Sequence, residues 1–151
     1  FTKSSFSEKD EQFNLSELID KIVEKYNNKN ISTNIYSRIY FNGRKNLIKR
    51  CLNNLIDNGI KYGTKINVEL NKNNNNLFIK IEDNGPGIPK YEYENVFKPF
   101  YKIDKSRGDS KSSVGLGMSI ASDIVQSHGG SIRLEKSNLL KGLNVRIFLP
   151  L

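Results

Sequence analysis

The chain has 151 residues, the size of one ordinary domain, and this length can bury a core without disulfides or metals. Its only cysteine, Cys51, excludes an internal disulfide framework, and together with its only histidine, His128, it speaks against a zinc site. Lysine and arginine outnumber aspartate and glutamate by 24 to 16, a formal charge of +8. These charges are spread over the whole chain, which disfavours a focused nucleic-acid-binding patch.

No apolar run approaches the roughly 18 residues that a membrane span requires. No signal peptide is visible, because no apolar run follows a basic start. From the length we expect residues 1–151 to be a single domain. Because the chain begins with Phe1 rather than methionine, we also expect it to be a fragment of a longer protein.

The first half of the chain alternates between helical and extended patterns. Residues 1–12 are polar and predict an extended or loose segment, after which Asn14 and Glu17 form a capping pair for a helix. Residues 31–35 and 39–41 predict two short strands, and a long helix follows. The apolar faces of the two helices consist of Leu15, Leu18, Ile19, Ile22, Val23 and Tyr26, and of Leu47, Ile48, Cys51, Leu52, Leu55, Ile56 and Ile60.

The second half predicts two β-hairpins separated by a loop-rich segment and a helix. Each hairpin has apolar residues at every second position on both sides of a polar turn. Between them lies a charged, Ser-rich stretch that is longer than packing requires, and we expect it to form a flexible lid. In chain order the elements are hairpin strands 66–70 and 77–81, loop 83–89, short helix 91–97, lid 101–114, helix 115–128 and hairpin strands 132–134 and 145–149.

Together these elements predict an α+β two-layer sandwich. Because hairpins dominate, the sheet should be mixed and mainly antiparallel, with about five strands. The three helices would then cover one face of the sheet, with the lid at the surface.

Four short segments carry residues suited to binding chemistry. The first, N-L-I-D-N-G-I-K-Y-G at 54–63, places Asn54, Asn58 and Lys61 on one edge of the long helix, beside its apolar stripe. The amide oxygen of Asn58 suits a hard cation such as Mg²⁺, and the Lys61 ammonium suits a phosphate. A solvated helix face without a role is the alternative.

The second segment, D-N-G-P-G-I-P at 83–89, ends a strand that we expect to be buried. A buried carboxylate at Asp83 needs hydrogen-bond donors, and the amino group of a purine is one. Gly85 and Gly87 let the backbone approach a flat ring closely, although an ordinary turn can have the same composition.

The other two segments flank the predicted lid. In V-F-K-P-F-Y-K at 96–102, Phe97 and Phe100 would anchor its base with Lys102 facing phosphate, or the aromatic residues only pin a loop. In G-L-G-M-S-I-A at 115–121, two glycines open a helix whose free N–H groups favour phosphate. The sequence contains neither a P-loop nor a G-x-G-x-x-G after a strand.

The two singular residues are expected to be structural. His128 stands in S-H-G-G at the end of the last helix, where its charge would suit the helix C-terminus. A phosphoacceptor histidine is instead expected on an exposed helix with acidic neighbours. Cys51 lies on an apolar stripe and is predicted to be a buried small residue.

In this order and spacing the four segments resemble the catalytic, ATP-binding domain of bacterial sensor histidine kinases. That domain belongs to the GHKL superfamily of gyrase, the large heat-shock chaperone, histidine kinases and MutL. The resemblance spans about 13–149, and P-F-Y-K-I-D at 99–104 with V-G-L-G-M-S-I-A at 114–121 is most similar to EnvZ-type osmosensor kinases. It implies the Bergerat fold of this superfamily, with ATP and Mg²⁺ as ligands.

The resemblance also implies a role for each matching residue. Asn58 would coordinate Mg²⁺, with Asn54 as the other polar position of its box, and Asp83 would bind the adenine amino group. Asn58, Lys61 and Lys102 would form the catalytic set, with Lys102 reaching the γ-phosphate. The other nucleotide-binding positions would be Tyr62, Gly85, Gly87, Ile88, Gly115, Leu116 and Gly117.

The implied reaction is transfer of the γ-phosphoryl group to a histidine on a separate dimerisation and phosphoacceptor domain of the same kinase, and from there to an OmpR-like response regulator. ATPase relatives use a glutamate where Asn54 stands, and an amide cannot act as a general base, so efficient hydrolysis is disfavoured. The domain would lie in the cytoplasm, in a kinase anchored in the inner membrane. Without a phosphoacceptor segment the fragment should be monomeric and should not phosphorylate itself.

Several alternatives stay open. Ser113 stands where the family usually has a further glycine, which favours a nucleotide-binding regulatory module (pseudokinase) that binds ATP without transfer. A GHKL-type ATPase, an anti-sigma-like serine kinase and a basic nucleic-acid binder are the others, although we expect no nucleic-acid partner.

Overall fold

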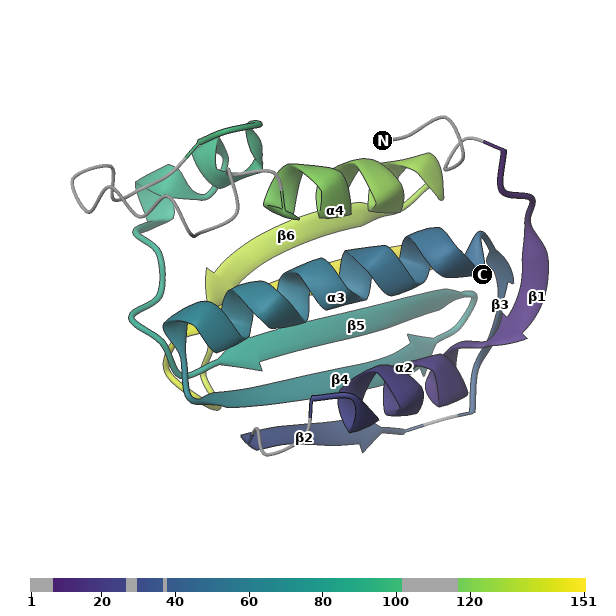
Figure 1. The fold of residues 1–151 in the computed structure, drawn as a ribbon, viewed down its shortest axis with the longest axis horizontal. Helices are drawn as coiled ribbons and strands as arrows, with labels where there is room; N and C mark the ends of the chain where they lie inside the picture. Colours follow the sequence, from purple (N-terminus) through teal and green to yellow (C-terminus); the bar gives the residue numbers. More distant parts are fainter. Residues whose placement is uncertain (1–6, 27–29, 37, 102–116) are drawn as a thin grey trace.

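The computed structural model describes residues 7–26, 30–36, 38–101 and 117–151. Within these ranges it contains a five-stranded sheet in the order β2-β4-β5-β7-β6, in which β2 and β4 are parallel and the other pairs antiparallel. Helices α2, α3 and α4 lie on one face of this sheet (Figure 1). The elements are β1 (Glu11–Asn14), α2 (Leu15–Glu24), β2 (Asn30–Ile35), β3 (Tyr40–Gly43), α3 (Lys45–Tyr62), β4 (Lys65–Asn73), β5 (Asn76–Asp83), η1 (Lys90–Glu92), η2 (Asn95–Phe97), α4 (Gly117–Ser127), β6 (Ser131–Lys136) and β7 (Leu143–Pro150).

This arrangement confirms the predicted two-layer α+β fold and its mixed, mainly antiparallel sheet. Alternate residues of the central strand β5 fill the space below the helices, and the apolar stripes of α2 and α3 are buried against them. No helix in the described part of the chain is both long and apolar enough to cross a membrane.

The N-terminal segment differs from the prediction. Residues 11–14 form β1, which pairs antiparallel with β3 outside the main sheet, so Glu11 and Gln12 are extended, whereas their pairing was not predicted. Only Phe13 of this strand is buried, and its ring meets Phe41 edge-on at 5.9 Å between centroids. The strand is too short and too polar to show an alternating pattern, and its pairing partner decides its conformation.

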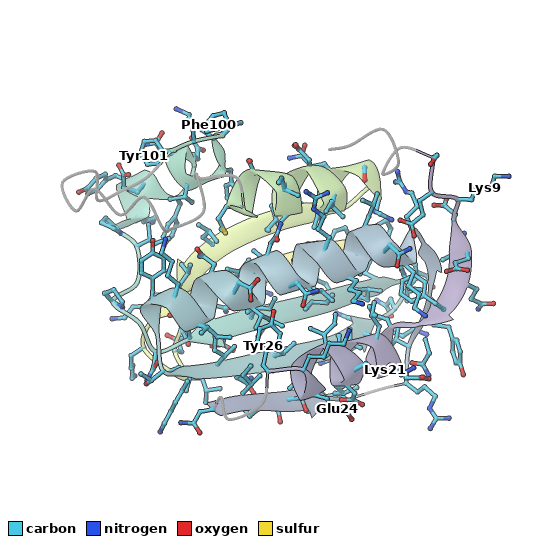
Figure 2. The ribbon with its side chains drawn as sticks, viewed as in Figure 1. Lys9, Lys21, Glu24, Tyr26, Phe100 and Tyr101 are labelled. Carbon is cyan, nitrogen blue, oxygen red and sulfur yellow. The ribbon has the colours of Figure 1, made fainter. Side chains whose placement is uncertain are left out.

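The first helix begins as the sequence predicts. The side-chain oxygen of Asn14 accepts a hydrogen bond from the Glu17 N–H at 3.0 Å. At the other end of this segment, the Tyr26 hydroxyl donates to Asp57 on α3 at 2.8 Å, and Figure 2 shows the Tyr26 side chain between α2 and α3. The contact fixes α2 against the helix that carries the first candidate segment.

Cys51 sits where α3 packs on α4. Its side chain is 1% exposed and its thiol lies 3.7 Å from the Ala121 carbonyl oxygen, so the prediction of a buried small residue is confirmed. Burial raises the pKa of this thiol to about 12. Cys51 and Ala121 are small, and they let the two helices approach closely.

The region after β5 is less helical than expected. In place of one short helix over 91–97, the chain forms two separate 3₁₀ turns, η1 and η2. Each turn has only three residues, and Tyr93 and Glu94 lie between them. The final helix α4 is described from Gly117, so the expected start at Gly115 lies outside the described residues.

His128 is structural, but its charge does not serve the helix end. Its Nε2 accepts a hydrogen bond from the backbone N–H of Arg44 at 3.0 Å, and its Nδ1 lies 2.8 Å from the Ile124 carbonyl oxygen. The ring is therefore neutral, with the proton on Nδ1. Burial lowers the pKa of His128, which corrects the expectation of a cation at the C-terminus of α4.

Candidate functional site

The ends of β5 and α3, the start of α4 and the turn between β6 and β7 gather at the same end of the molecule (Figure 1). The described parts of the four candidate segments lie at or next to this end. The described elements there carry Asn54, Asn58, Asp83, Gly85 and Gly117.

Asp83 is a buried acid at this end, at the last position of β5. It is 7% exposed, and its Oδ1 accepts hydrogen bonds from the backbone N–H groups of Gly85 at 2.9 Å and Leu143 at 3.2 Å. Burial raises the pKa of the Asp83 carboxyl, and these two N–H groups act in the opposite direction. The carboxylate is thus held in one orientation by backbone atoms on both sides.

The second carboxylate oxygen of Asp83 faces the long helix. A methyl group at Gly59 of α3 would lie 3.8 Å from Oδ2, so this oxygen is next to the turn of α3 that carries Asn58. Among the described residues, Oδ2 makes no hydrogen bond. This oxygen is not among the fully buried polar atoms without a partner, so it is accessible, and a ligand with an N–H group can bind it.

Two asparagines of α3 face the start of α4. The Asn54 amide nitrogen lies 3.5 Å from the Gly117 carbonyl oxygen, and the Asn58 amide nitrogen lies 4.0 Å from the Met118 sulfur. Both side chains are half-buried. Their amide oxygens accept no hydrogen bond from the part of the chain that the structure describes, so the Asn58 oxygen is free for a cation.

Lys61 and Tyr62 lie at the exposed rim of this end. The Lys61 ammonium sits over the Tyr62 ring, 5.2 Å from its centroid, and both side chains are exposed. They share the helix edge with Asn54 and Asn58, but the structure does not bring them against Asp83.

The loop after β5 borders a cavity of about 740 Å³. Gly87 adopts a φ of +75°, which L residues rarely tolerate, and Ile88 is half-buried against the core. On the other side of the loop, a methyl group at Gly85 would lie 2.7 Å from the Tyr62 carbonyl oxygen. The cavity is lined by Pro86, Gly87, Ile88, Pro89, Lys90, Tyr93, Leu134, Glu135, Lys136, Lys141 and Gly142.

Two residues at this end were not selected from the sequence. The Asn84 side-chain oxygen accepts from the N–H groups of Thr64 at 2.7 Å and Lys65 at 2.9 Å, which ties the loop to the end of α3. Gly142 packs so closely on Asp83 that a methyl group there would lie 2.3 Å from the Asp83 carbonyl oxygen. Asn84 stands inside the second segment, whereas nothing in the sequence places Gly142 beside Asp83.

Part of the predicted site cannot be located. Lys102, Gly115 and Leu116 lie outside the described residues, as do Ser113 and all of the predicted lid after Tyr101. At the last described position before it, the Tyr101 hydroxyl donates to the Glu92 carboxylate, and Figure 2 shows Tyr101 beyond the start of α4.

The chain is similar to known proteins in both sequence and fold. The family model described as "Histidine kinase-, DNA gyrase B-, and HSP90-like ATPase" matches residues 43–151. The chain is 47% identical over 77 residues to the signal transduction histidine-protein kinase ArlS of Staphylococcus epidermidis, and 45% identical over 74 residues to ArlS of Staphylococcus aureus. These alignments cover 51% and 49% of the chain but only 17% and 16% of the relatives.

Solved structures agree over nearly the whole chain. The catalytic domain of histidine kinase ThkA superposes with a TM-score of 0.81 at 26% identity, covering 94% of this chain and 95% of that one. The mycobacterial sensor histidine kinase MprB gives a TM-score of 0.79 at 26% identity, covering 93% and 97%. The chain belongs to the family of histidine kinase-, DNA gyrase B- and HSP90-like ATPases, as a catalytic domain of the sensor histidine kinase type.

Proposed function

We propose that this chain binds ATP with Mg²⁺ and donates the γ-phosphoryl group to a histidine on a separate dimerisation and phosphoacceptor domain of its parent kinase. The observation that carries the proposal is the Asp83 carboxylate, buried at the end of β5 with one oxygen satisfied and the other open. A carboxylate held in one orientation with one accessible oxygen is suited to accept a hydrogen bond from a ligand N–H group.

The free Oδ2 of Asp83 accepts a hydrogen bond from the amino group of adenine. Gly85, Gly87 and Ile88 form the wall against which the base lies, because the two glycines keep side chains out of its plane. A base that lacks the amino group leaves Oδ2 unsatisfied, so the site discriminates among purines.

The polar edge of α3 serves the phosphates. The free amide oxygen of Asn58 is a suitable ligand for Mg²⁺, which usually takes one or two protein oxygens together with phosphate oxygens and water. When bound, Mg²⁺ neutralises charge on the phosphates. Lys61 supplies a positive charge from the rim. Tyr62, Lys102, Gly115, Leu116 and Gly117 complete the nucleotide site as the resemblance implies.

Asn54 favours phosphoryl transfer over hydrolysis. Its amide cannot take a proton from water, and its nitrogen instead points to the Gly117 carbonyl oxygen at the start of α4. In phosphoryl transfer positioning and charge neutralisation do most of the work, so the domain needs no base of its own. The nucleophile is the partner's histidine.

The wider setting follows from the same proposal. The partners are the phosphoacceptor domain and an OmpR-like response regulator, and the domain lies in the cytoplasm of a bacterium, in a kinase anchored in the inner membrane. The EnvZ-type osmosensor assignment stays a prediction, because the matched relatives are named ArlS, ThkA and MprB.

The test is calorimetric titration of ATP into the chain, with and without Mg²⁺. We expect one-to-one binding that Mg²⁺ strengthens and that Asp83→Asn weakens at least about 100-fold. The asparagine oxygen can still accept from Gly85 and Leu143, while its NH₂ group opposes the adenine amino group. Asp20→Asn, which changes an exposed carboxylate on α2, is the matched control.

A phosphoryl-transfer assay distinguishes a kinase from a protein that only binds the nucleotide. Radiolabelled ATP and a separate phosphoacceptor segment are added to the chain, and label on its histidine supports transfer. ATP binding without label at any segment concentration would favour the pseudokinase. Equal ATP affinity in the wild type and Asp83→Asn would overturn the adenine assignment.

A further inference from the structure

The turn between β6 and β7 makes two contacts with Asp83 that none of the four candidate segments includes. The Gly142 N–H donates to the Asp83 carbonyl oxygen at 3.0 Å, and the Leu143 N–H donates to Oδ1 at 3.2 Å. One turn therefore holds both the backbone and the carboxylate of the buried acid. In Figure 1 this turn lies beside the ends of β5 and α3.

The turn is fastened by a buried serine. Ser137 is 0% exposed, and its hydroxyl accepts from the Leu140 N–H at 2.9 Å. Its backbone closes the turn, because the Ser137 N–H donates to the Gly142 carbonyl oxygen at 2.7 Å and its carbonyl accepts from Lys141 at 3.0 Å. The position of Gly142 thus depends on the position of Ser137.

Ser137 is in turn held by the neighbour of Asp83. Its hydroxyl donates to the Glu82 Oε2 at 2.6 Å, a short, charge-assisted hydrogen bond. Successive residues of a strand point to opposite faces of the sheet, so Asp83 points to the helices and Glu82 to the face that the helices leave open. Glu82 is nevertheless only 6% exposed. The turn reaches across the end of β5 and contacts both faces of the strand.

We propose that Glu82 and Ser137 are positioning residues that fix the orientation of the Asp83 carboxylate and so determine the preference for adenine. The inference rests on the proposed function, since it gives Asp83 the adenine amino group as its ligand. When the Ser137 hydroxyl is absent, Glu82 and the Leu140 N–H lose their partner, the turn relaxes, and Leu143 no longer holds Oδ1. Asp83 then rotates, and its second oxygen leaves the position that the amino group needs.

The test compares ATP with inosine triphosphate, which carries a carbonyl oxygen in place of the amino group. Calorimetry gives both dissociation constants for the wild type, Ser137→Ala and Glu82→Gln. We expect Ser137→Ala to weaken ATP binding about five-fold or more and to leave inosine triphosphate binding nearly unchanged, so the preference shrinks. Glu82→Gln keeps an oxygen that accepts from Ser137, and it should retain the preference.

Controls separate positioning from general damage. Ser122→Ala removes a buried hydroxyl from the middle of α4, which accepts only from Gln126 at 3.2 Å among the described residues, and it should leave both affinities unchanged. If Ser137→Ala does not fold, Ser137→Cys keeps the volume with a weaker donor and should give an intermediate preference. An equal loss for both nucleotides would mean that Ser137 only stabilises the fold.

The two proposals fail in different ways. If the wild type and Asp83→Asn both bind ATP and inosine triphosphate with equal affinity, the proposed adenine site is overturned. A preference that disappears in Asp83→Asn but persists in Ser137→Ala leaves the adenine site standing and overturns the role of Glu82 and Ser137.

Discussion

At the start of α3 the surrounding protein accepts hydrogen bonds from the free backbone N–H groups of the helix. At the other end, two side-chain oxygens have no partner among the described residues. The Glu8 carboxylate accepts from the N–H groups of Asn46 at 2.8 Å and Leu47 at 3.2 Å, and His128 accepts from Arg44. At the other end, Asp83 Oδ2 and the Asn58 amide oxygen make no hydrogen bond within the described residues. We call these the structural end and, following the proposed function, the ligand end of α3.

The difference shows how one helix can serve both folding and binding. Helix N-terminal N–H groups attract anions, and at the start of α3 a protein carboxylate occupies that position. The end of α3 is held instead by Asn84 and by the close approach of Gly85 to the Tyr62 carbonyl oxygen. On the side of α3 these contacts use backbone atoms, so they leave the side chains of Asn54 and Asn58 free for a ligand.

The largest expected effect comes from disturbing the ligand end at Gly142. Gly142→Ala places a methyl group 2.3 Å from the Asp83 carbonyl oxygen and 2.4 Å from Oδ1, so the turn and the acid must move apart. We expect the free energy of unfolding to fall by about 3 kcal/mol and ATP binding to be lost. Urea denaturation and calorimetry measure the two effects.

The control for this substitution is another glycine at the same end. A methyl group at Gly117 meets no described atom within 4 Å, so Gly117→Ala should change stability by less than about 1 kcal/mol. Equal stability losses in the two variants would show that the contact between Gly142 and Asp83 is not tight in solution.

A smaller effect is expected from acid at the structural end. The pKa of His128 lies below its ordinary value of 6.5 because the ring is buried; Arg44 lowers it further, while Ile124, Asp10 and Glu8 oppose the shift. As the pH falls below about 6.5, His128 is therefore protonated in the unfolded chain before it is protonated in the folded one. The free energy of unfolding then falls, by at most about 1.4 kcal/mol per pH unit. A protonated Nε2 would also face the Arg44 N–H without an acceptor.

Urea denaturation at pH 7.5 and 6.0 in the wild type and His128→Gln measures this effect. The wild type should lose stability over this interval, and the variant should show a flatter dependence from a lower starting value. Asp83 has the opposite sign, since its raised pKa favours the folded state as the pH falls, and it is present in both proteins. The same slope in both proteins would remove His128 as its source.

The sequence predicted the helices and hairpins because their patterns are local. Asn14 and Glu17, three residues apart, show the start of α2, and the alternation of β5 marks a strand with a buried face. The strand β1 was missed because its conformation depends on β3, about 30 residues away. The predicted charge of His128 was also wrong, because its burial comes from Phe41 on β3 and from Arg44 just before α3, which the S-H-G-G motif does not contain.

The site divides along the same line. Asn54, Asn58, Asp83 and Gly85 stand in short motifs, and the structure brings them to one end. Gly142 contacts Asp83, and Ser137 contacts Glu82, only because the fold joins distant parts of the chain, so no spacing in the sequence indicates them. Residues that touch a ligand can thus be found by motif, whereas residues that position them require the fold.

The smallest effect concerns the middle of α3, between its two ends. Cys51 is 1% exposed against α4, and burial raises the pKa of its thiol to about 12, so the native protein at pH 8 should react with an aromatic disulfide reagent only through opening of the α3–α4 contact. We expect labelling at least about 100-fold slower than in urea. ATP should leave this labelling rate nearly unchanged if binding at the ligand end does not alter how often the α3–α4 contact around Cys51 opens. A rate that falls strongly with ATP would mean that α3 opens as one unit with its ligand end, and that the two ends are not separate.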